Sequence, residues 1–199
     1  MSVREVLSAI AIVLTFAGYV PYVRSIHAGK TKPHVFSWII WGAATLIVFV
    51  AQLASGGGAG AWPIGVSGAI TLYVAVLAYV KRGDSAITRL DWMFLMAALS
   101  ALPLWYVTAN PLWAVILLTT ADTIGFGPTF RKAYDAPYEE DVVFYGMFTV
   151  RNVISAAALE EYSVTTLLFP LVVAASCAAF VVMILIRRQQ VADASGERG

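Results

Sequence analysis

Two charged residues in otherwise apolar stretches are the first candidates for chemistry. Asp122 lies within the apolar segment 111–130, and Arg151 lies within 142–159. A charge near the centre of a bilayer costs at least about 2.5–3.5 kcal/mol on insertion scales, so such side chains face a bundle interior or pair with each other. A buried aspartate can take up a proton, and an arginine can hold a carboxylate. We therefore expect Asp122 and Arg151 to lie close together at a substrate or proton site, with a purely structural ion pair as the alternative.

Uncharged residues at similar depth are secondary candidates for the same site. They are Thr15, Thr119 and Asn152, although a threonine hydroxyl in a helix often bonds only its own backbone. Trp38 and Trp41 are three residues apart and so share one helix face. We expect them to line the site and stack on a ligand ring, or else to pack in the core.

The remaining reactive side chains do not form a catalytic or metal-binding set. A single cysteine, Cys177, and two histidines, His27 and His34, are too few for a zinc-type site, so no metal or cofactor is expected. The histidines lie in a basic loop without a neighbouring acid, which argues against a hydrolase triad and against an enzyme. No basic stripe with interleaved aromatic residues is present, so nucleic acid is not an expected partner.

The composition is that of an all-α integral membrane protein. Hydrophobic residues make up 60% of the 199 residues, charged residues 13%, and the mean hydropathy is +0.78. Soluble domains carry about 25% charged residues, and a membrane span needs about 20 mostly apolar ones. We predict seven spans, and the lipid bilayer as a partner, at 6–23, 34–54, 59–80, 91–108, 111–130, 142–159 and 163–186.

The distribution of lysine and arginine predicts the orientation of these spans. With the N-terminus outside, only Arg4 lies on the outer side, and eleven basic residues lie on the other: Arg24, Lys30, Lys32, Lys81, Arg82, Arg89, Arg131, Lys132, Arg187, Arg188 and Arg198. The positive-inside rule then places the C-terminus of this multi-pass protein of the cell membrane in the cytoplasm. The first span also has features of a signal peptide, but we expect it to be retained because it belongs to an internal repeat.

That repeat has a constant offset of 107 residues. Gly18, Pro21 and Arg24 at the end of the first span match Gly125, Pro128 and Arg131 at the end of the fifth. Pro63 matches Pro170 in the same register, and several aromatic positions correspond. We therefore interpret spans 1–3 and 5–7 as two copies of one three-helix unit.

Two parallel copies of a three-helix unit require one extra crossing between them, and span four provides it. The predicted organisation is 1–80 for the first unit, 81–110 for the linker helix, 111–187 for the second unit and 188–199 for a flexible cytoplasmic tail. Parallel repeats of this kind place a site at their interface near the membrane midplane. In the first unit, the counterparts of Asp122 and Arg151 are Thr15 and Ala44.

With this 3+1+3 layout and the paired prolines, the chain resembles the SWEET and PQ-loop (SemiSWEET-like) superfamily over about residues 6–187. The resemblance implies a small-molecule solute that passes between the units of a protein in a bacterial inner membrane. Pro21 and Pro128, with Gly18 and Gly125 three residues before them, are expected to be hinges, or else fixed kinks that shape the packing. The family's Pro-Gln dipeptide is replaced here by Pro21-Tyr22 and Pro128-Thr129. The asparagine that sugar-carrying members place in the third helix of each unit is also missing, since those helices offer Ser67 and Ser176.

We therefore expect a small-solute membrane transporter that works by alternating access. Transport is proton-coupled if Asp122 titrates and is facilitated diffusion if it does not. The alternative on the same fold is a non-transporting membrane receptor or scaffold protein. Neither the solute nor the oligomeric state follows from the sequence.

Overall fold

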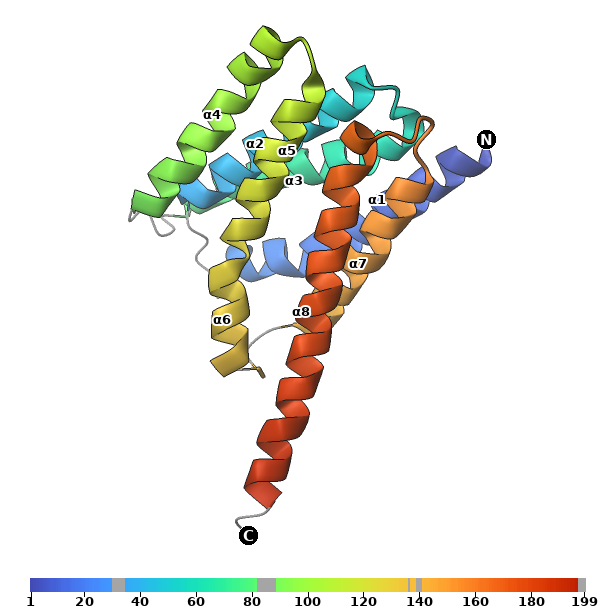
Figure 1. Ribbon diagram of the computed structural model, residues 1–199. Coiled ribbons are helices and arrows are strands. Elements are labelled where there is room, and N and C mark those ends of the chain that lie inside the picture. Colours follow the sequence, from blue (N-terminus) through green and yellow to red (C-terminus); the bar gives the residue numbers. More distant parts are fainter. Residues whose placement is uncertain (30–34, 82–88, 136, 139–140, 197–199) are drawn as a thin grey trace.

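A computed structural model describes residues 1–29, 35–81, 89–135, 137–138 and 141–196, and this part of the chain is helical (Figure 1). The helices run in the order α1 (Val3–His27), α2 (Val35–Ala54), a short 3-10 helix η1 (Gly58–Ala61), α3 (Trp62–Val80), α4 (Arg89–Thr108), α5 (Pro111–Gly125), α6 (Gly127–Asp135), α7 (Val142–Ala157) and α8 (Val164–Gly196). Connections between them are mostly short, so neighbouring helices pack side by side.

Helix α1 shows how the sequence separates two environments. Its start is fixed by a capping box, in which Ser2 and Glu5 satisfy each other's backbone N–H groups. One face is exposed and apolar, with Val6, Ile10, Val13, Phe16 and Val20. The opposite face is buried and consists largely of small and polar residues: Ser8, Ala11, Thr15 and Gly18, with Tyr19 beside them. Small residues at helix contacts and large apolar ones outside are the pattern of a helix that faces lipid.

Four helical segments are long and apolar enough to cross a membrane: Val3–His27, Val35–Ala54, Gly58–Val80 and Val164–Ala192. Three further apolar helices are shorter, at Leu95–Thr108, Pro111–Gly125 and Val142–Ala157. Large apolar side chains are exposed on the outside of the bundle, for example on α4 at Met93, Met96, Leu99 and Leu102. A soluble protein rarely exposes so much contiguous apolar surface. The molecule is therefore an all-helical protein of the membrane class.

Two sets of three helices show the same pattern of contacts. The first set is α1, α2 and α3, and the second set is α5, α7 and α8. Within each set a long antiparallel pair forms, α2 with α3 and α7 with α8. Helix α1 packs against α3 and α7, while α5 packs against α8 and α2. Thus the first helix of each set contacts the third helix of its own set and the second helix of the other. Helix α4 packs on α5 and α2, at one side of this arrangement (Figure 1).

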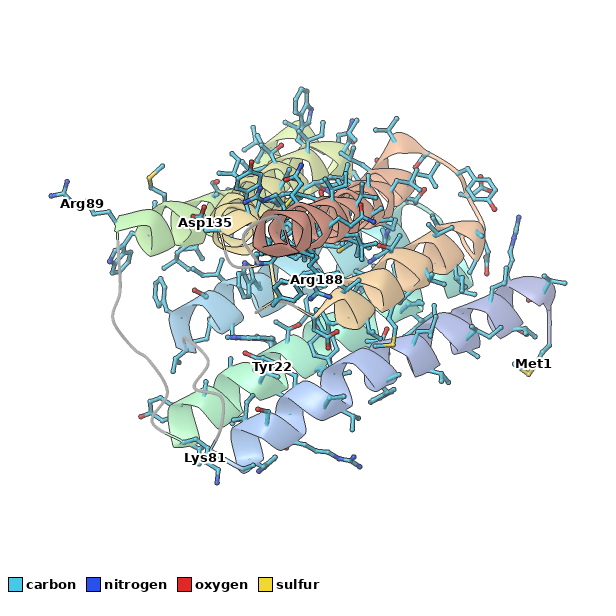
Figure 2. The ribbon with its side chains drawn as sticks, turned by 90° about the horizontal axis from the view of Figure 1, so that it is seen from below. Met1, Tyr22, Lys81, Arg89, Asp135 and Arg188 are labelled. Carbon is cyan, nitrogen blue, oxygen red and sulfur yellow. The ribbon has the colours of Figure 1, made fainter. Side chains whose placement is uncertain are left out.

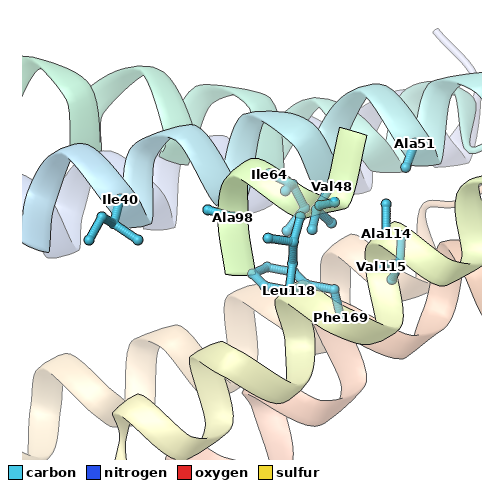
Figure 3. Packing of buried hydrophobic residues seen from close by; sticks show 10 residues of the cluster. Ile40, Val48, Ala51, Ile64, Ala98, Ala114, Val115, Leu118 and Phe169 are labelled. Atoms are coloured by element: carbon cyan, nitrogen blue, oxygen red, sulfur yellow. The ribbon is translucent and has the colours of Figure 1, made fainter. Parts of the chain in front are cut away.

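A hydrophobic core holds the two sets together. Ile64 on α3, Val48 on α2, Leu118 on α5 and Phe169 on α8 meet in it, together with Ala98 of α4 (Figure 3). A second cluster lies among Phe126, Phe130, Tyr145 and Phe180, where edge-to-face ring contacts join α7 and α8 to the α5–α6 junction. Aromatic pairs of this geometry add about 0.5–1.5 kcal/mol beyond their burial.

The predicted fifth span, 111–130, is not one helix. Helix α5 ends at Gly125, and α6 begins at Gly127 after the capping residue Phe126, whose N–H donates to the Asp122 carbonyl at 3.1 Å. Two glycines and Pro128 within four residues explain the interruption, since glycine weakens a helix and proline fits only its first turn.

The predicted tail also differs from the structure. Helix α8 continues through Gly196, so the segment 188–196 is helical, and residues 197–199 lie outside the described part. Arg188 explains part of this extension, because its Nε donates to the Pro137 carbonyl at 3.0 Å. Arg187 stacks on the Tyr134 ring at 4.0 Å from its centre. Between Pro170 and Gly196 the helix also contains no glycine or proline.

Two loops close one end of the bundle. The N–H of Glu161 donates to the Gly56 carbonyl at 3.1 Å, and the N–H of Glu160 donates to the Gly57 carbonyl at 3.2 Å. Ser8 of α1 donates to the Ala59 carbonyl at 2.7 Å and joins the same end. Lys81 and Arg89 lie far from Met1, on the other side of the molecule (Figure 2).

Candidate functional site

A cavity of about 610 Å³ lies between the two sets of helices. Residues of α1, α2 and α3 form part of its wall, and residues of α5, α7 and α8 form the rest. Seven of the residues singled out from the sequence line it: Gly18, Pro21, Trp38, Trp41, Asp122, Gly125 and Arg151. Thr15, Thr119 and Asn152 do not line it, and the side chain of Pro128 lies outside the described residues.

Arg151 on α7 is held by neutral groups from both sets of helices. Its Nε donates to Thr15 Oγ1 at 3.0 Å, its Nη1 to Asn152 Oδ1 at 2.9 Å, and its Nη2 to the Pro63 carbonyl. The side chain is only 3% exposed. Thr15 and Asn152 therefore act behind the cavity wall, where they orient the guanidinium and do not contact the cavity themselves.

The expected proximity of Asp122 and Arg151 takes the form of a shared cavity and not of a direct ion pair. Both side chains border the same cavity, but no ion pair joins them in the described part of the chain. The reason is packing, because α7 runs along α1 and α8, whereas α5 runs along α8 and α2. Arg151 therefore meets Thr15, which is the counterpart of Asp122 in the repeat, offset by 107 residues.

Aromatic rings form much of the cavity wall. Trp38 stacks on Tyr22, with ring centres 5.1 Å apart and an interplanar angle of 27°, and Trp41 meets Trp38 edge to face. The expected aromatic lining at Trp38 and Trp41 is thus part of the cavity surface. Tyr22 was not singled out from the sequence, although its place directly after Pro21 was a usable signal.

Two further wall residues were missed as well. Tyr19 places its hydroxyl 3.0 Å from Thr71 Oγ1 and 3.3 Å from Ser67 Oγ on α3. Its ring meets Phe148 edge to face at 5.5 Å, and the Arg151 guanidinium lies 5.7 Å from the Phe148 ring centre. Tyr19 and Phe148 therefore link the first set of helices to the arginine. Contacts between residues more than a hundred positions apart leave no local pattern in a sequence.

The proposed hinge residues occupy different settings. Pro21 lies inside the continuous helix α1, where its ring removes one backbone hydrogen bond. Gly125 stands at the end of α5, and Pro128 follows in the first turn of α6, so the second set has a true helix interruption. The hinge positions match in sequence, but the helix is interrupted only in the second set, between Gly125 and Gly127.

Gly18 has a packing role that its assignment as a hinge did not include. A Cβ atom at this position would lie 2.7 Å from Cε2 of Phe148, closer than real Cβ contacts come. The missing side chain therefore lets α7 approach α1 and brings the Phe148 ring next to Tyr19 and Arg151.

We expect Gly18→Ala to destabilise the protein by about 1–3 kcal/mol, the usual cost of overpacking a core contact. The measurement is thermal unfolding in detergent. Phe148→Leu in the same chain should recover most of the loss, because the smaller side chain leaves room for the added methyl group. Equal destabilisation in the single and the double variant would contradict the assigned contact.

The remaining candidate, Thr119, is buried and does not line the cavity. Thr119 Oγ1 has no hydrogen-bond partner, although its carbonyl accepts from Thr123 Oγ1 at 2.8 Å. Among the described residues, no three histidine, cysteine or acidic side chains come together to hold a metal ion.

Comparison of the chain with protein-family models, curated proteins and solved structures gave no significant match. The fold and the site alone define its class. It is an all-helical protein with membrane-span candidates. A cavity lined by aromatic rings and by Asp122, Asp141 and Arg151 lies between its two sets of helices.

Proposed function

We propose that the chain is a small-solute transporter of the SWEET and PQ-loop type, with seven spans arranged as 3+1+3. The exchange of contacts between the two sets supports this. Helix α1 of the first set packs against α7 of the second, and its counterpart α5 packs against α2 of the first. Two parallel copies of a three-helix unit related by an axis along the membrane normal have this property. Helix α4, which belongs to neither copy, is then the linker.

The observation that carries the proposal is the cavity itself. It lies between the two units and holds both of the charges found at mid-depth in the predicted spans, Asp122 and Arg151. A scaffold protein needs no such space between repeats, whereas alternating access needs a solute site that each side can reach in turn. Its wall also includes Ser25, near the end of α1, and Asp141, which caps α7. Both residues belong to the side predicted to be cytoplasmic, so in this proposal the cavity is the inward-facing form of the solute site.

The opposite end is closed by contacts between the units. Gly60 lies against the backbone of Leu159, and a Cβ atom added at Gly60 would clash with the Leu159 nitrogen. Ser155 donates to the Gly60 carbonyl at 2.8 Å, and Gln52 Nε2 donates to the Thr166 carbonyl at 2.7 Å. These contacts must separate in the outward-facing state, so they form the outer gate of the proposed transporter.

A disulfide across the outer gate tests alternating access. The Glu160 carboxylate accepts from the Ala59 N–H at 3.2 Å, so Ala59→Cys with Glu160→Cys introduces thiols on the two segments that meet there, and mass spectrometry verifies that the disulfide forms. In a Cys177→Ala background, we expect oxidation to stop uptake into proteoliposomes and reduction to restore it. A panel of labelled carboxylates, amino acids and sugars identifies the solute that the unlocked protein carries.

Each single-cysteine variant is the matched control, and its uptake should not respond to oxidant. Full transport by the oxidised double variant would show that this contact is no gate. If the wild-type protein carried no solute of the panel, the receptor or scaffold alternative would take its place.

The orientation is tested by reporter fusions. We expect a reporter after Arg188 to be cytoplasmic and one within the loop Gly56–Gly58 to be external, because eleven of twelve basic residues in the predicted loops lie on the other side from that loop. Alkaline phosphatase and green fluorescent protein fusions report the two compartments. A glycine loop found in the cytoplasm would overturn both the predicted span count and the repeat.

A further inference from the structure

Arg151 is a buried cation without an anionic partner among the residues that the structure describes. Its three protein acceptors are a hydroxyl, an amide and a backbone carbonyl, none of which carries charge. A guanidinium has five N–H donors, so two remain after these bonds. The side chain borders the cavity while only 3% exposed. A desolvated cation with unused donors favours an anion, and a planar guanidinium fits a carboxylate best.

The rest of the cavity surface fits an apolar or aromatic body. Phe148 lies against the guanidinium, and Tyr22, Trp38 and Phe169 also face the space. The volume of about 610 Å³ lies within the range of pockets that hold small organic ligands. A solute with one carboxylate and a ring or short apolar chain would satisfy both parts of the wall.

The charge balance of the cavity indicates that Asp122 also takes part when a carboxylate binds at Arg151. Among the described residues, the charged side chains of the wall are Asp122, Arg151 and Asp141. Asp141 is exposed at the start of α7, where its carboxylate accepts hydrogen bonds from the N–H groups of Val143 and Phe144. The interior therefore holds one negative and one positive side chain. Its other titratable groups are Tyr19 and Tyr22 of α1, Tyr145 of α7 and Cys177 of α8.

A bound carboxylate would give this interior a net charge of −1, which is costly in a medium of low dielectric constant. One proton restores neutrality. Asp122 is the acceptor for it, because Arg151 is already charged and no described side chain forms an ion pair with Asp122. Cys177, Asp122 and Arg151 all line this one cavity, so the two charges lie around the same space.

We propose that the cavity binds a monocarboxylate at Arg151 together with one proton at Asp122, so that each cycle carries no net charge. The carboxylate accepts the two free guanidinium N–H groups, and the apolar body of the solute lies against the aromatic wall. This proposal rests on the transport function proposed above for the same cavity. It names the class of solute and the site of the proton.

Binding in detergent tests the proposal separately from transport. Four monocarboxylates (acetate, lactate, benzoate and phenylacetate) are each compared with the corresponding amide, with tryptophan fluorescence as the readout because Trp38 and Trp41 line the cavity. We expect at least one acid to bind tenfold or more tightly than its amide at pH 6, and the preference to shrink at pH 8. A pH indicator in weak buffer should show uptake of close to one proton for each carboxylate bound.

Variants of Asp122 and Arg151 assign the proton and the carboxylate to these two groups. Asp122→Asn should keep the preference for the acid but lose both the proton uptake and the pH dependence. Arg151→Gln should bind acid and amide equally, and Arg151→Lys, which keeps the charge, should retain part of the preference if the glutamine variant does not fold. Acids that bind no better than their amides, or proton uptake that persists in Asp122→Asn, would overturn the proposal. Proton-linked binding by a protein that carries no solute would uphold this site and refute the proposed transport.

Discussion

Replacing Asp122 with asparagine is expected to abolish proton-driven accumulation of solute while the protein remains folded. Asparagine has nearly the same shape as aspartate but cannot take up a proton at neutral pH. No hydrogen bond or ion pair of the described residues depends on the Asp122 carboxylate, so the change removes no structural contact. Accumulation against a gradient in proteoliposomes with an imposed pH difference should fall at least tenfold, whereas exchange of solute across equal concentrations should continue.

The matched control is Asp141→Asn. Asp141 also borders the cavity, but it is exposed and caps α7 through its bonds to Val143 and Phe144. Asparagine is as good a capping residue as aspartate, so this variant should transport normally. If Asp122→Asn accumulated solute like the wild type, Asp122 would have no role in coupling, and facilitated diffusion would be the correct description.

Replacing Arg151 with alanine is expected to lower the free energy of unfolding by at least about 2 kcal/mol. Three hydrogen bonds to a charged donor, worth about 1.5 kcal/mol each, are lost, and two of them join α7 to α1 and α3. Removal of a buried charge offsets part of this, by about 2.5–3.5 kcal/mol on insertion scales. The lost burial of its three methylene groups adds about 0.8 kcal/mol for each, so the loss outweighs the gain.

Thermal unfolding in a mild detergent measures this effect, and Thr15→Val provides the comparison. That variant removes a single acceptor of Arg151 and should cost about 1–2 kcal/mol. In the double variant, Thr15→Val should add little to Arg151→Ala, because both changes break the same bond. Additive losses would show that Thr15 and Arg151 stabilise the protein independently and would contradict the assigned contact.

The sequence by itself determined the class of the protein and its two charged candidates, Asp122 and Arg151. Its long apolar stretches predict membrane helices, and the structure has four segments of sufficient length and hydropathy with three shorter apolar helices between them. Charges in apolar stretches are costly, so Asp122 and Arg151 could be selected without a structure. Hydrophobicity and the cost of burying a charge are properties of single residues and short segments, which a sequence displays directly.

Only the tertiary structure decided which of these residues meet. Asp122 and Arg151 belong to the same set of helices and border one cavity, as expected. The hydrogen bonds of Arg151, however, go to Thr15 and the Pro63 carbonyl of the other set, because α7 crosses to α1. Gly18 likewise became a packing position for Phe148 through the same crossing. The partner of a side chain depends on which helix lies beside its own, and packing of whole helices sets that choice. The interruption between Gly125 and Gly127 had a local signal in two glycines and Pro128, whereas the crossing of α1 and α7 had none.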